Sequence, residues 1–324
     1  MSNIFIGIDG GASKTAGVAV DEQGQVLAAE KTEGSAIFAA PAPQPLRVLK
    51  GLVKSLRTAA GVKSENLTVG LGLNGVDFDD EILMQHAAIA EALGVEKNRL
   101  ILVNDGIVAL WGATAARGAA LWQHGSSFTS AYRSDYGRET LFDNLDVGKC
   151  YDIRVQAVAL VARMIDGRAK SSSLQDTILQ HLGLTPRQYA AAVWRRQADQ
   201  NRVFTLAKVV FDAFESGEPS AAKLVAAAID DYAVAASAMI ARTGRDDAEV
   251  AFGGGVIAQA GPTFWQRLTQ RVHQFKPAAR VTPAQMPPQC GAAVMVAFAA
   301  GLDVKTFYGS LKESWAKQSG AANA

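Results

Sequence analysis

The residues best equipped for chemistry near the start of the chain form a glycine turn with polar neighbours. The turn reads Asp9-Gly10-Gly11-Ala12-Ser13-Lys14-Thr15. Two glycines let the backbone approach a ligand closely, and the exposed N–H groups with Ser13, Lys14 and Thr15 could hold phosphate oxygens. Asp9, at the end of a predicted strand, could hold a metal ion through water. A Walker A loop is excluded because Ser13 precedes Lys14 and no helix pattern follows; a plain hairpin turn is the competing interpretation.

Two further signals come later in the chain. Asn104-Asp105-Gly106 follows an apolar run, and ligands of open α/β sheets bind at the carboxyl ends of strands. Asp105 there is well placed as a general base toward a hydroxyl, although it could simply cap the next helix. Gly253-Gly254-Gly255 also follows an apolar run, and backbone without side chains could lie against a nucleotide ring or ribose. The competing interpretation of the glycines is a loose loop.

The first third of the chain supplies elements that would position the two aspartates. Short apolar runs divided by Gly and Asp turns predict an antiparallel meander. Apolar residues at steps of three and four predict helices. The expected order is three strands (4–8, 15–20, 25–29), a helix (44–60), a strand (68–73), a helix (79–93), a strand (100–103) and another helix. This order predicts a mixed sheet covered by helices.

The rest of the chain repeats this order in a looser form. It predicts strands at 118–122 and 249–252, a hairpin-like stretch at 127–141, and helices at 153–165, 174–182, 200–215 and 221–243. We therefore expect an N-terminal domain of residues 1–112 and a C-terminal domain of residues 113–302. A C-terminal helix at about 303–318 could return to the first domain.

Composition limits the class of protein. The 324 residues suit two domains, and Lys+Arg of 32 against Asp+Glu of 31 gives no charge excess for nucleic acid or a membrane surface. Cys150 and Cys290 form neither a disulfide framework nor a metal knuckle, which fits a reducing cytosol. With no signal-peptide pattern and no apolar run of about 18 residues, we expect a soluble cytoplasmic protein. The Ala-rich face of 221–241 could serve a homodimer, but an internal helix is favoured.

The order of the three signals resembles that of the acetate and sugar kinase, heat-shock 70 and actin superfamily. More narrowly, the chain resembles the family that joins N-acetylglucosamine kinase to the ATPases of benzoyl-CoA reductase. The resembling pieces are IGIDGGASKTAGVAVDEQGQVL, GLGLNGVD, LVNDGIVALWGA, DVGKCYDI, and FGGGVI followed by PPQCGAA, over residues 4 to 298. The resemblance implies an α/β, two-domain, actin-like ATPase (ribonuclease H-like) fold with mixed sheets, flanking helices and a nucleotide in the interdomain cleft.

The resemblance also implies ligands and roles. ATP and Mg²⁺ would be bound, with Asp9 positioning the metal and Asp105 taking the proton from the attacking sugar hydroxyl. The phosphates of ATP would be held by Gly10, Gly11, Ser13, Lys14 and Thr15 and by Gly125, Ser126 and Ser127, and its adenosine by Gly253, Gly254 and Gly255. The sugar would be held by Asn104, Asp105, Asp146, Gly34, Ser35 and Asn74.

Three segments depart from the family pattern. Its Gly-Thr-Gly-Ser phosphate loop is replaced by Gln123-His124-Gly125-Ser126-Ser127, a bulkier loop in which His124 could touch phosphate or sugar, or be a partly exposed loop histidine. The Asp-Glu-Gly-Ser segment reads Asp146-Val147-Gly148-Lys149. The sugar-binding Asn of Gly-x-Ala-Asn is Ile37, which has no hydrogen-bonding side chain. The favoured substrate is N-acetylglucosamine, phosphorylated to the 6-phosphate, and glucosamine comes next.

Two other functions stay open from the sequence. One is an ATPase activator of a reductase or dehydratase, a class that holds an iron–sulfur cluster with two Cys from each of two subunits. Cys150 and Cys290 lack the short spacing this would favour. The other is a non-catalytic protein that binds sugar or nucleotide on the kinase fold, as the altered loops would permit. A sugar kinase is favoured over both.

Overall fold

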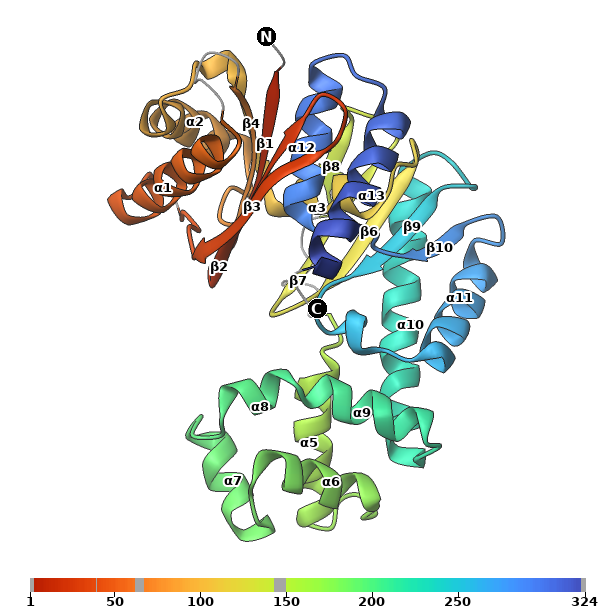
Figure 1. Cartoon of the computed structure of the whole chain (residues 1–324). Helices are drawn as coiled ribbons and strands as arrows, with labels where there is room; N and C mark the ends of the chain where they lie inside the picture. The colour runs from red at the N-terminus through yellow and green to blue at the C-terminus, as the bar shows by residue number, and fades with distance from the viewer. Residues whose placement is uncertain (1–2, 39, 62–66, 143–149, 322–324) are drawn as a thin grey trace. The chain divides into compact units, whose positions relative to one another are not determined.

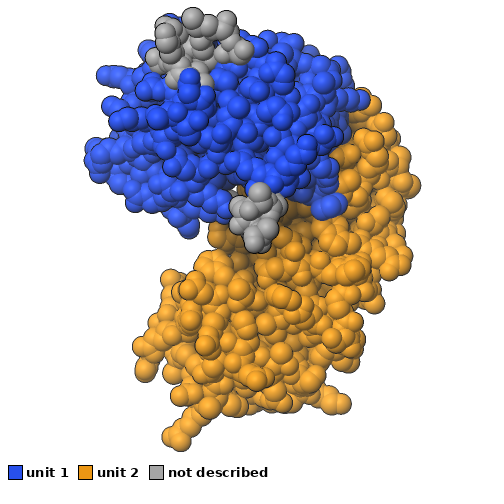
Figure 2. Space-filling model, in the orientation of Figure 1, with its two compact units in different colours: residues 1–121, 130–141, 283–324 blue, residues 122–129, 142–282 orange. Residues whose placement is uncertain are grey.

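A computed structural model describes residues 3–38, 40–61, 67–142 and 150–321 (Figure 1). The chain divides into two compact units, coloured separately in Figure 2. The first unit comprises Met1–Leu121, Ser130–Leu141 and Pro283–Ala324, and the second Trp122–Thr129 and Phe142–Thr282.

The first unit contains a five-stranded mixed sheet in the order β3-β2-β1-β4-β5. Its strands are β1 (Ile4–Gly10), β2 (Lys14–Asp21), β3 (Val26–Glu33), β4 (Leu67–Leu73) and β5 (Leu100–Asn104). The first three strands pair antiparallel, whereas β4 runs parallel to both β1 and β5. The predicted meander followed by two strands is confirmed. The parallel trio β1, β4 and β5 brings the carboxyl ends of all three strands to one edge.

One face of this sheet is covered by two helices, α1 (Pro43–Ala59) and α2 (Asp79–Leu93) (Figure 1). Alternate residues of β1 share a core with α1 residues that recur at helical spacing. This core includes Ile4, Ile6, Ile8, Leu49, Leu52 and Leu56. The helix α2 begins after Phe78 with a capping Glu81 and ends at Gly94, which adopts the left-handed conformation. A short 3₁₀ helix, η2 (Lys97–Arg99), leads into β5.

The opposite face is covered by α3 (Asp105–Ala113) and α12 (Pro288–Ala299), with α13 (Val304–Ala321) beyond them (Figure 1). Gly7 and Gly70 are register partners on β1 and β4, and this pair lets α12 lie directly on the strands. A Cβ on Gly7 would lie 2.1 Å from the carbonyl oxygen of Gln289. Phe5 meets Phe307 of α13 edge to face, with ring centroids 5.8 Å apart. Strand alternation therefore directs Asp9 to the same side of the sheet as α3.

A second five-stranded sheet has the order β10-β9-β6-β7-β8. Its strands are β6 (Ala119–His124), β7 (Phe128–Arg133), β8 (Glu139–Leu141), β9 (Glu249–Gly253) and β10 (Arg280–Pro283). The antiparallel pairing of β7 with β8 confirms the predicted hairpin. The strand β10 was not predicted from the sequence.

Helices make up most of the second unit. They are α5 (Ile153–Ile165), α6 (Ser173–Leu182), α7 (Pro186–Trp194), α8 (Gln200–Phe204), α9 (Leu206–Glu215), α10 (Pro219–Arg242) and α11 (Pro262–Phe275), with a 3₁₀ turn η3 (Ile257–Gln259). The prediction of a single helix at 200–215 is wrong, because this segment forms two helices, α8 and α9, that are separated at Thr205. The hydroxyl of Thr205 donates to the carbonyl oxygens of Asn201 and Arg202.

The longest helix, α10, is long and apolar enough to cross a membrane, judged by length and composition alone. Among the described residues, no other helix is. Half of its most apolar 18-residue stretch is buried inside the protein, and the helix packs against α9 and α11. Buried Leu224, Tyr232 and Ile240 give it the character of a core helix, which is the favoured interpretation from the sequence.

Candidate functional site

The first unit brings Asp9 and Asp105 close enough for the charge of Asp105 to raise the pKa of Asp9. Asp9 is the penultimate residue of β1, and Asp105 is the first residue of α3, directly after β5. Both therefore lie at the carboxyl edge of the parallel strands, where the sequence placed a ligand site. The two most chemically suggestive aspartates of the sequence are thus neighbours across the sheet edge.

Both carboxyl groups have raised pKa values. Burial raises the pKa of Asp9 to about 7, the charge of Asp105 raises it further, and the charge of Lys14 opposes the change. Burial also raises the pKa of Asp105, assisted by the charge of Asp77, while a hydrogen bond from Asn74 lowers it. A carboxyl group whose pKa is moved toward neutrality is well suited to accept a proton from a hydroxyl.

Two asparagines fix the position of Asp105. The Nδ2 of Asn74 donates to the Oδ2 of Asp105 at 3.4 Å. The Oδ1 of Asn104 accepts from the backbone N–H of Gly106 at 2.7 Å, and its Nδ2 donates to the Oδ1 of Asp77 at 2.7 Å. The helix cap is therefore Asn104, and the alternative in which Asp105 caps α3 is wrong. Contact of Asn104 with a sugar stays a prediction.

The glycine turn between β1 and β2 is held by buried hydroxyls. The Oγ1 of Thr15 donates to the Oγ of Ser35 at 2.7 Å, and both side chains are fully buried. The backbone N–H of Ser35 donates to the carbonyl oxygen of Gly11 at 3.0 Å. The side chains of Ser13 and Lys14 are exposed. These contacts fix the turn while leaving its outer side chains accessible to a phosphate.

The segment 34–37 is packed against this turn. A Cβ on Gly34 would lie 2.0 Å from the carbonyl oxygen of Ala12, so only glycine fits there. Ile37 is buried in the hydrophobic core, and its N–H donates to the carbonyl oxygen of Asn74 at 3.1 Å. The N–H of Asn74 in turn donates to the carbonyl oxygen of Gly10 at 2.9 Å. The predicted residues Gly10, Gly34, Ser35 and Asn74 are thus connected through one hydrogen-bonded set of loops.

The donors around Asp9 suit Mg²⁺. Among the residues that the structure describes, no three His, Cys, Asp or Glu side chains converge into a complete metal cage. Mg²⁺ does not need one, since it commonly binds one or two carboxylates and completes its shell with water and substrate phosphates. The charge of Asp105 raises the pKa of the partly buried Asp9, so a cation placed here would relieve repulsion between the two carboxylates. Asp9, with Asp105 nearby, therefore fits the role of metal-holding residue.

The second unit brings the two remaining predicted loops together. Gly125 follows β6, and its N–H donates to the carbonyl oxygen of Ser127 at 2.9 Å, while Ser126 and Ser127 are exposed. Gly254 has a φ of +91°, and a Cβ there would lie 2.3 Å from the carbonyl oxygen of His124. That oxygen accepts from the N–H of Val256 at 3.0 Å. The 125–127 loop and the 253–255 glycines are therefore joined at His124.

The environment of His124 matches neither of the interpretations from the sequence, which were a contact with phosphate or sugar and a partly exposed loop histidine. It is the last residue of β6 and is completely buried, so neither a ligand contact nor a partly exposed loop position describes it. Its Nδ1 lies 2.6 Å from the hydroxyl of Tyr232, and its ring stacks on Phe128 with centroids 4.0 Å apart. Burial lowers its pKa below the usual 6.5, whereas Asp152 opposes that shift. Tyr232 is 108 positions away in the chain, so no local pattern of residues could indicate this contact.

One predicted substrate residue falls outside the described structure. Asp146, together with Val147 to Lys149, lies in the segment 143–149, which is not among the described residues. Its role in holding the sugar stays a prediction.

Comparison with known proteins identifies the family to which this sequence is similar and solved structures with a similar fold. A sequence model of the BadF/BadG/BcrA/BcrD ATPase family matches residues 6–296. The chain is 26% identical over 313 residues to an N-acetyl-D-glucosamine kinase of Dictyostelium discoideum, covering 90% of this chain and 97% of that protein.

Two solved structures have the same architecture. A Porphyromonas gingivalis protein provisionally described as an N-acetylglucosamine kinase superposes with a TM-score of 0.65 at 18% identity, over 92% of this chain and 99% of that one. A ROK family glucokinase from Streptomyces griseus, in complex with glucose and AMPPNP, gives a TM-score of 0.54 at 16% identity, over 92% and 99%. The predicted actin-like ATPase fold is confirmed.

Proposed function

Because the chain belongs to the BadF/BadG/BcrA/BcrD ATPase family, we propose that it is an ATP-dependent kinase that phosphorylates a hydroxyl of an amino sugar. The observation that carries this proposal is the pair Asp9 and Asp105 at the carboxyl edge of the first sheet, both with raised pKa values. One supplies a position for a metal ion and the other a base. Transfer of a phosphoryl group to an alcohol needs both.

In the proposed reaction, Asp105 accepts the proton of the attacking sugar hydroxyl. The hydroxyl oxygen forms a bond to the γ-phosphorus of ATP, and the bond from that phosphorus to the β–γ bridging oxygen breaks, which releases ADP. Asn74 holds Asp105 in position through its 3.4 Å bond. Because phosphoryl transfer depends mainly on positioning and charge neutralisation, this small set of groups suffices.

The phosphates and the metal are assigned to groups around Asp9. The exposed Ser13 and Lys14 and the N–H groups of the turn would hold phosphate oxygens. Asp9 would hold Mg²⁺, which when bound would neutralise negative charge on the phosphates. Gly125 to Ser127 would hold phosphate, and Gly253 to Gly255 would line the adenosine site. The AMPPNP in the Streptomyces griseus glucokinase supports ATP as the donor.

The proposed acceptor is N-acetylglucosamine, giving the 6-phosphate, with glucosamine as the second choice. The Dictyostelium discoideum and Porphyromonas gingivalis relatives support an N-acetylated amino sugar. Against a strict preference, Ile37 is buried where the family pattern has a sugar-binding Asn. A site with fewer hydrogen-bonding partners discriminates less, so we expect measurable activity on more than one sugar. The reaction would take place in the cytoplasm, where ATP is available.

The proposal is tested by ADP release from Mg²⁺-ATP against N-acetylglucosamine, glucosamine, glucose, N-acetylmuramic acid and acidic sugars. We expect an amino sugar to accelerate ADP release most strongly and at least one other sugar to accelerate it to a smaller extent. Asp105→Asn should lower kcat by about 100- to 10,000-fold, because it removes the general base, while nucleotide binding stays close to that of the unaltered protein. Exposed Asp176→Asn is the matched control, and it should leave the rate unchanged.

The alternatives give different results in the same assay. ATP binding without acceleration by any sugar would overturn the kinase proposal and favour an ATPase activator, whereas sugar binding without ATP binding would favour a non-catalytic binder. Cys290 argues against a cluster-holding activator. Its thiol is fully buried in α12, and burial raises its pKa, which disfavours the thiolate that ligates iron.

A further inference from the structure

An ion pair with a buried arginine and a partly buried aspartate contacts the 125–127 loop, and the proposed reaction assigns neither residue a role. Arg154, on the first turn of α5, is 5% exposed. Its Nη2 donates to the Oδ2 of Asp152 at 2.7 Å, and its Nε donates to the Oδ1 at 3.0 Å. Asp152 also caps α5 by accepting the N–H of Arg154 at 2.8 Å. The pair is therefore bidentate and anchored to a helix end, so its geometry is fixed.

This pair contacts the loop directly. The Nη2 of Arg154 donates to the carbonyl oxygen of Ser126 at 3.2 Å and lies 3.4 Å from the Nε2 of His124. The Nε2 of His124 is also 3.7 Å from the Oδ2 of Asp152. One guanidinium thus contacts both the start and the middle of the loop, while Tyr232 holds the other side of the His124 ring.

The contacts of Arg154 with His124 and Ser126 lie at the segment where this sequence differs from the phosphate loop of the family. The family pattern Gly-Thr-Gly-Ser closes a tight turn with two glycines, whereas this chain has Gln123-His124-Gly125-Ser126. With one glycine fewer, backbone flexibility no longer supplies the turn, and side chains must hold it. The buried His124 and Arg154 and the partly buried Asp152 are available at that place.

We propose that Asp152 and Arg154 are positioning residues that hold the 125–127 loop in the shape that binds the phosphates of ATP. They act through the carbonyl oxygen of Ser126 and the ring of His124, and they do not touch the sugar. The inference rests on the proposed function only in taking phosphate as the ligand of the loop. The ordering of the loop by the ion pair can be measured separately.

The chain offers a matched control for this pair. Asp166 and Arg168 stand at the other end of α5 with the same spacing, and the Nη2 of Arg168 lies 2.6 Å from the Oδ2 of Asp166. Both side chains are largely exposed, at 62% for Arg168 and 44% for Asp166. Exposed pairs of this kind contribute little to stability or to a distant loop. Arg168→Ala therefore removes an equivalent ion pair without touching the loop.

The experiment compares Asp152→Asn, Arg154→Ala and Arg168→Ala with the unaltered protein. Asn caps a helix as well as Asp, so Asp152→Asn keeps the start of α5 while it weakens the ion pair. We expect both pair variants to raise the KM for ATP by about 10- to 100-fold, with the KM for the sugar within twofold. Hydrogen exchange of the 123–127 amides should become faster in both, and Arg168→Ala should change neither quantity.

A chemical rescue distinguishes positioning from general destabilisation. Arg154 lines a cavity of about 450 Å³ together with Val158, Val203 and Phe204, so a small cation can reach its place. Guanidinium chloride at millimolar concentration should restore ATP affinity and slow exchange of the loop in Arg154→Ala. Sodium chloride at the same concentration should not.

The outcomes separate the two proposals. Unchanged loop exchange and an unchanged KM for ATP in both pair variants would overturn the positioning role, and so would loss of ATP affinity that guanidinium fails to restore in a folded Arg154→Ala. If the unaltered protein phosphorylates no sugar but the pair variants still speed exchange of 123–127, the kinase proposal fails and the positioning of the loop stands.

Discussion

At the scale of single residues, the glycine turn that carries the proposed phosphate site depends on one buried hydroxyl pair. Thr15 is the second residue of β2 and Ser35 follows the end of β3, and their side chains form a hydrogen bond in a place without solvent access. A buried hydroxyl that loses its partner costs free energy because it leaves water without gaining a new bond. The shape of the turn is therefore sensitive to either residue.

Replacing one member of this pair should destabilise the protein. Thr15→Val keeps the shape of the side chain but removes its hydroxyl and leaves that of Ser35 buried without its partner. We expect the free energy of unfolding to fall by about 1–3 kcal/mol in urea titration. Ser35→Ala should cost a similar amount.

The double variant supplies the control for that prediction. In Thr15→Val with Ser35→Ala no hydroxyl is left unpaired, so the loss should be smaller than the sum of the two single losses. Additive losses would show that the two hydroxyls do not stabilise each other.

Some residues of the site could be predicted from the sequence and others could not. Asp9 and Asp105 were identifiable because each follows an apolar strand directly, and strand ends meet at a sheet edge. Asp152 and Arg154 were not, because an Asp two positions before an Arg at a helix start is common on protein surfaces. What makes this pair unusual is the burial of Arg154 beside His124, which depends on contacts between segments far apart in the chain.

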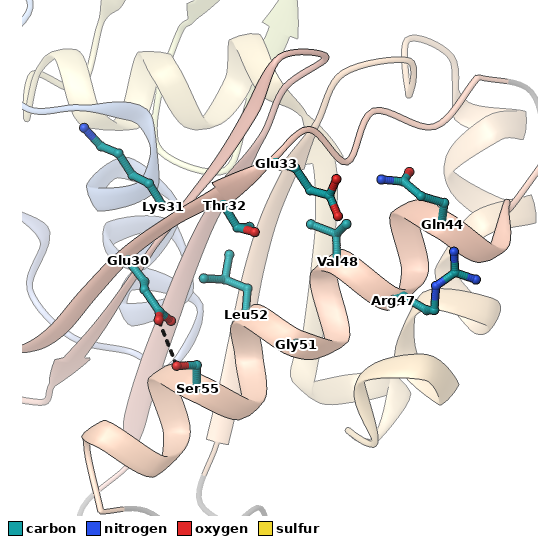
Figure 3. Close-up of a pocket in the computed structure, with 10 residues that line it drawn as sticks. All are labelled: Glu30, Lys31, Thr32, Glu33, Gln44, Arg47, Val48, Gly51, Leu52 and Ser55. Atoms are coloured by element: carbon teal, nitrogen blue, oxygen red, sulfur yellow. Dashed lines mark hydrogen bonds between the residues drawn. The ribbon is translucent and has the colours of Figure 1, made fainter.

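At the scale of elements, close backbone packing distinguishes α12 from α1. Gly291 of α12 lies against α3, and a Cβ there would be 2.0 Å from the carbonyl oxygen of Val108. Gly51 of α1 lies in the wall of a pocket of about 350 Å³ between α1 and β3, where Glu30 accepts a hydrogen bond from Ser55 (Figure 3). A Cβ on Gly51 would meet no atom within 4 Å.

The same substitution should therefore have opposite effects at these two glycines. Gly291→Ala forces α3 and α12 apart and should lower the free energy of unfolding by about 1–3 kcal/mol or more. Gly51→Ala should raise it by about 0.5–1 kcal/mol, because alanine is the better helix former and nothing obstructs its methyl group. Thermal or urea unfolding of the two variants checks the signs, and a loss of stability in Gly51→Ala would contradict the open environment described for it.

Local pattern accounts for most of the elements that were predicted. Amphipathic spacing and glycine stops located α1, α2, α5 and α6 within one or two residues. The pattern did not predict α11, which begins at Pro262 directly after Gly261. It also did not predict β10, a strand of four residues. It also joined α8 to α9, because the apolar spacing continues across Thr205 while the backbone does not.

At the scale of the whole molecule, the buried His124 makes stability depend on pH. Burial lowers the pKa of this imidazole below 6.5 in the folded protein, so between the lowered value and 6.5 the unfolded chain binds a proton that the folded chain does not. Lowering the pH through this window therefore favours unfolding. The nearby Asp152 has a lowered pKa, so its contribution changes only as the pH falls below about 3.8.

We expect His124→Gln to remove this part of the pH dependence. Its free energy of unfolding should decline less than that of the unaltered protein between pH 7.5 and pH 5.5, when both are measured by urea titration. Raised carboxyl pKa values, such as that of Asp9, act in the opposite direction but are common to both proteins and cancel in the comparison. Equal pH slopes would mean that His124 titrates in the folded protein as it does in water.

The covering of the first sheet by α12 also has a consequence for how the chain is made. The last strand of that sheet ends at Asn104, but the helix that lies on Gly7 and Gly70 ends only at Ala299. At 5–20 residues per second, a ribosome needs roughly 10–40 s to synthesise the segment between them. Throughout that interval the nascent chain carries a finished set of strands, and the part of one face that α12 later covers stays exposed even after α3 has been made. The N-terminal third of this protein is therefore the first part to be synthesised and among the last to be completed.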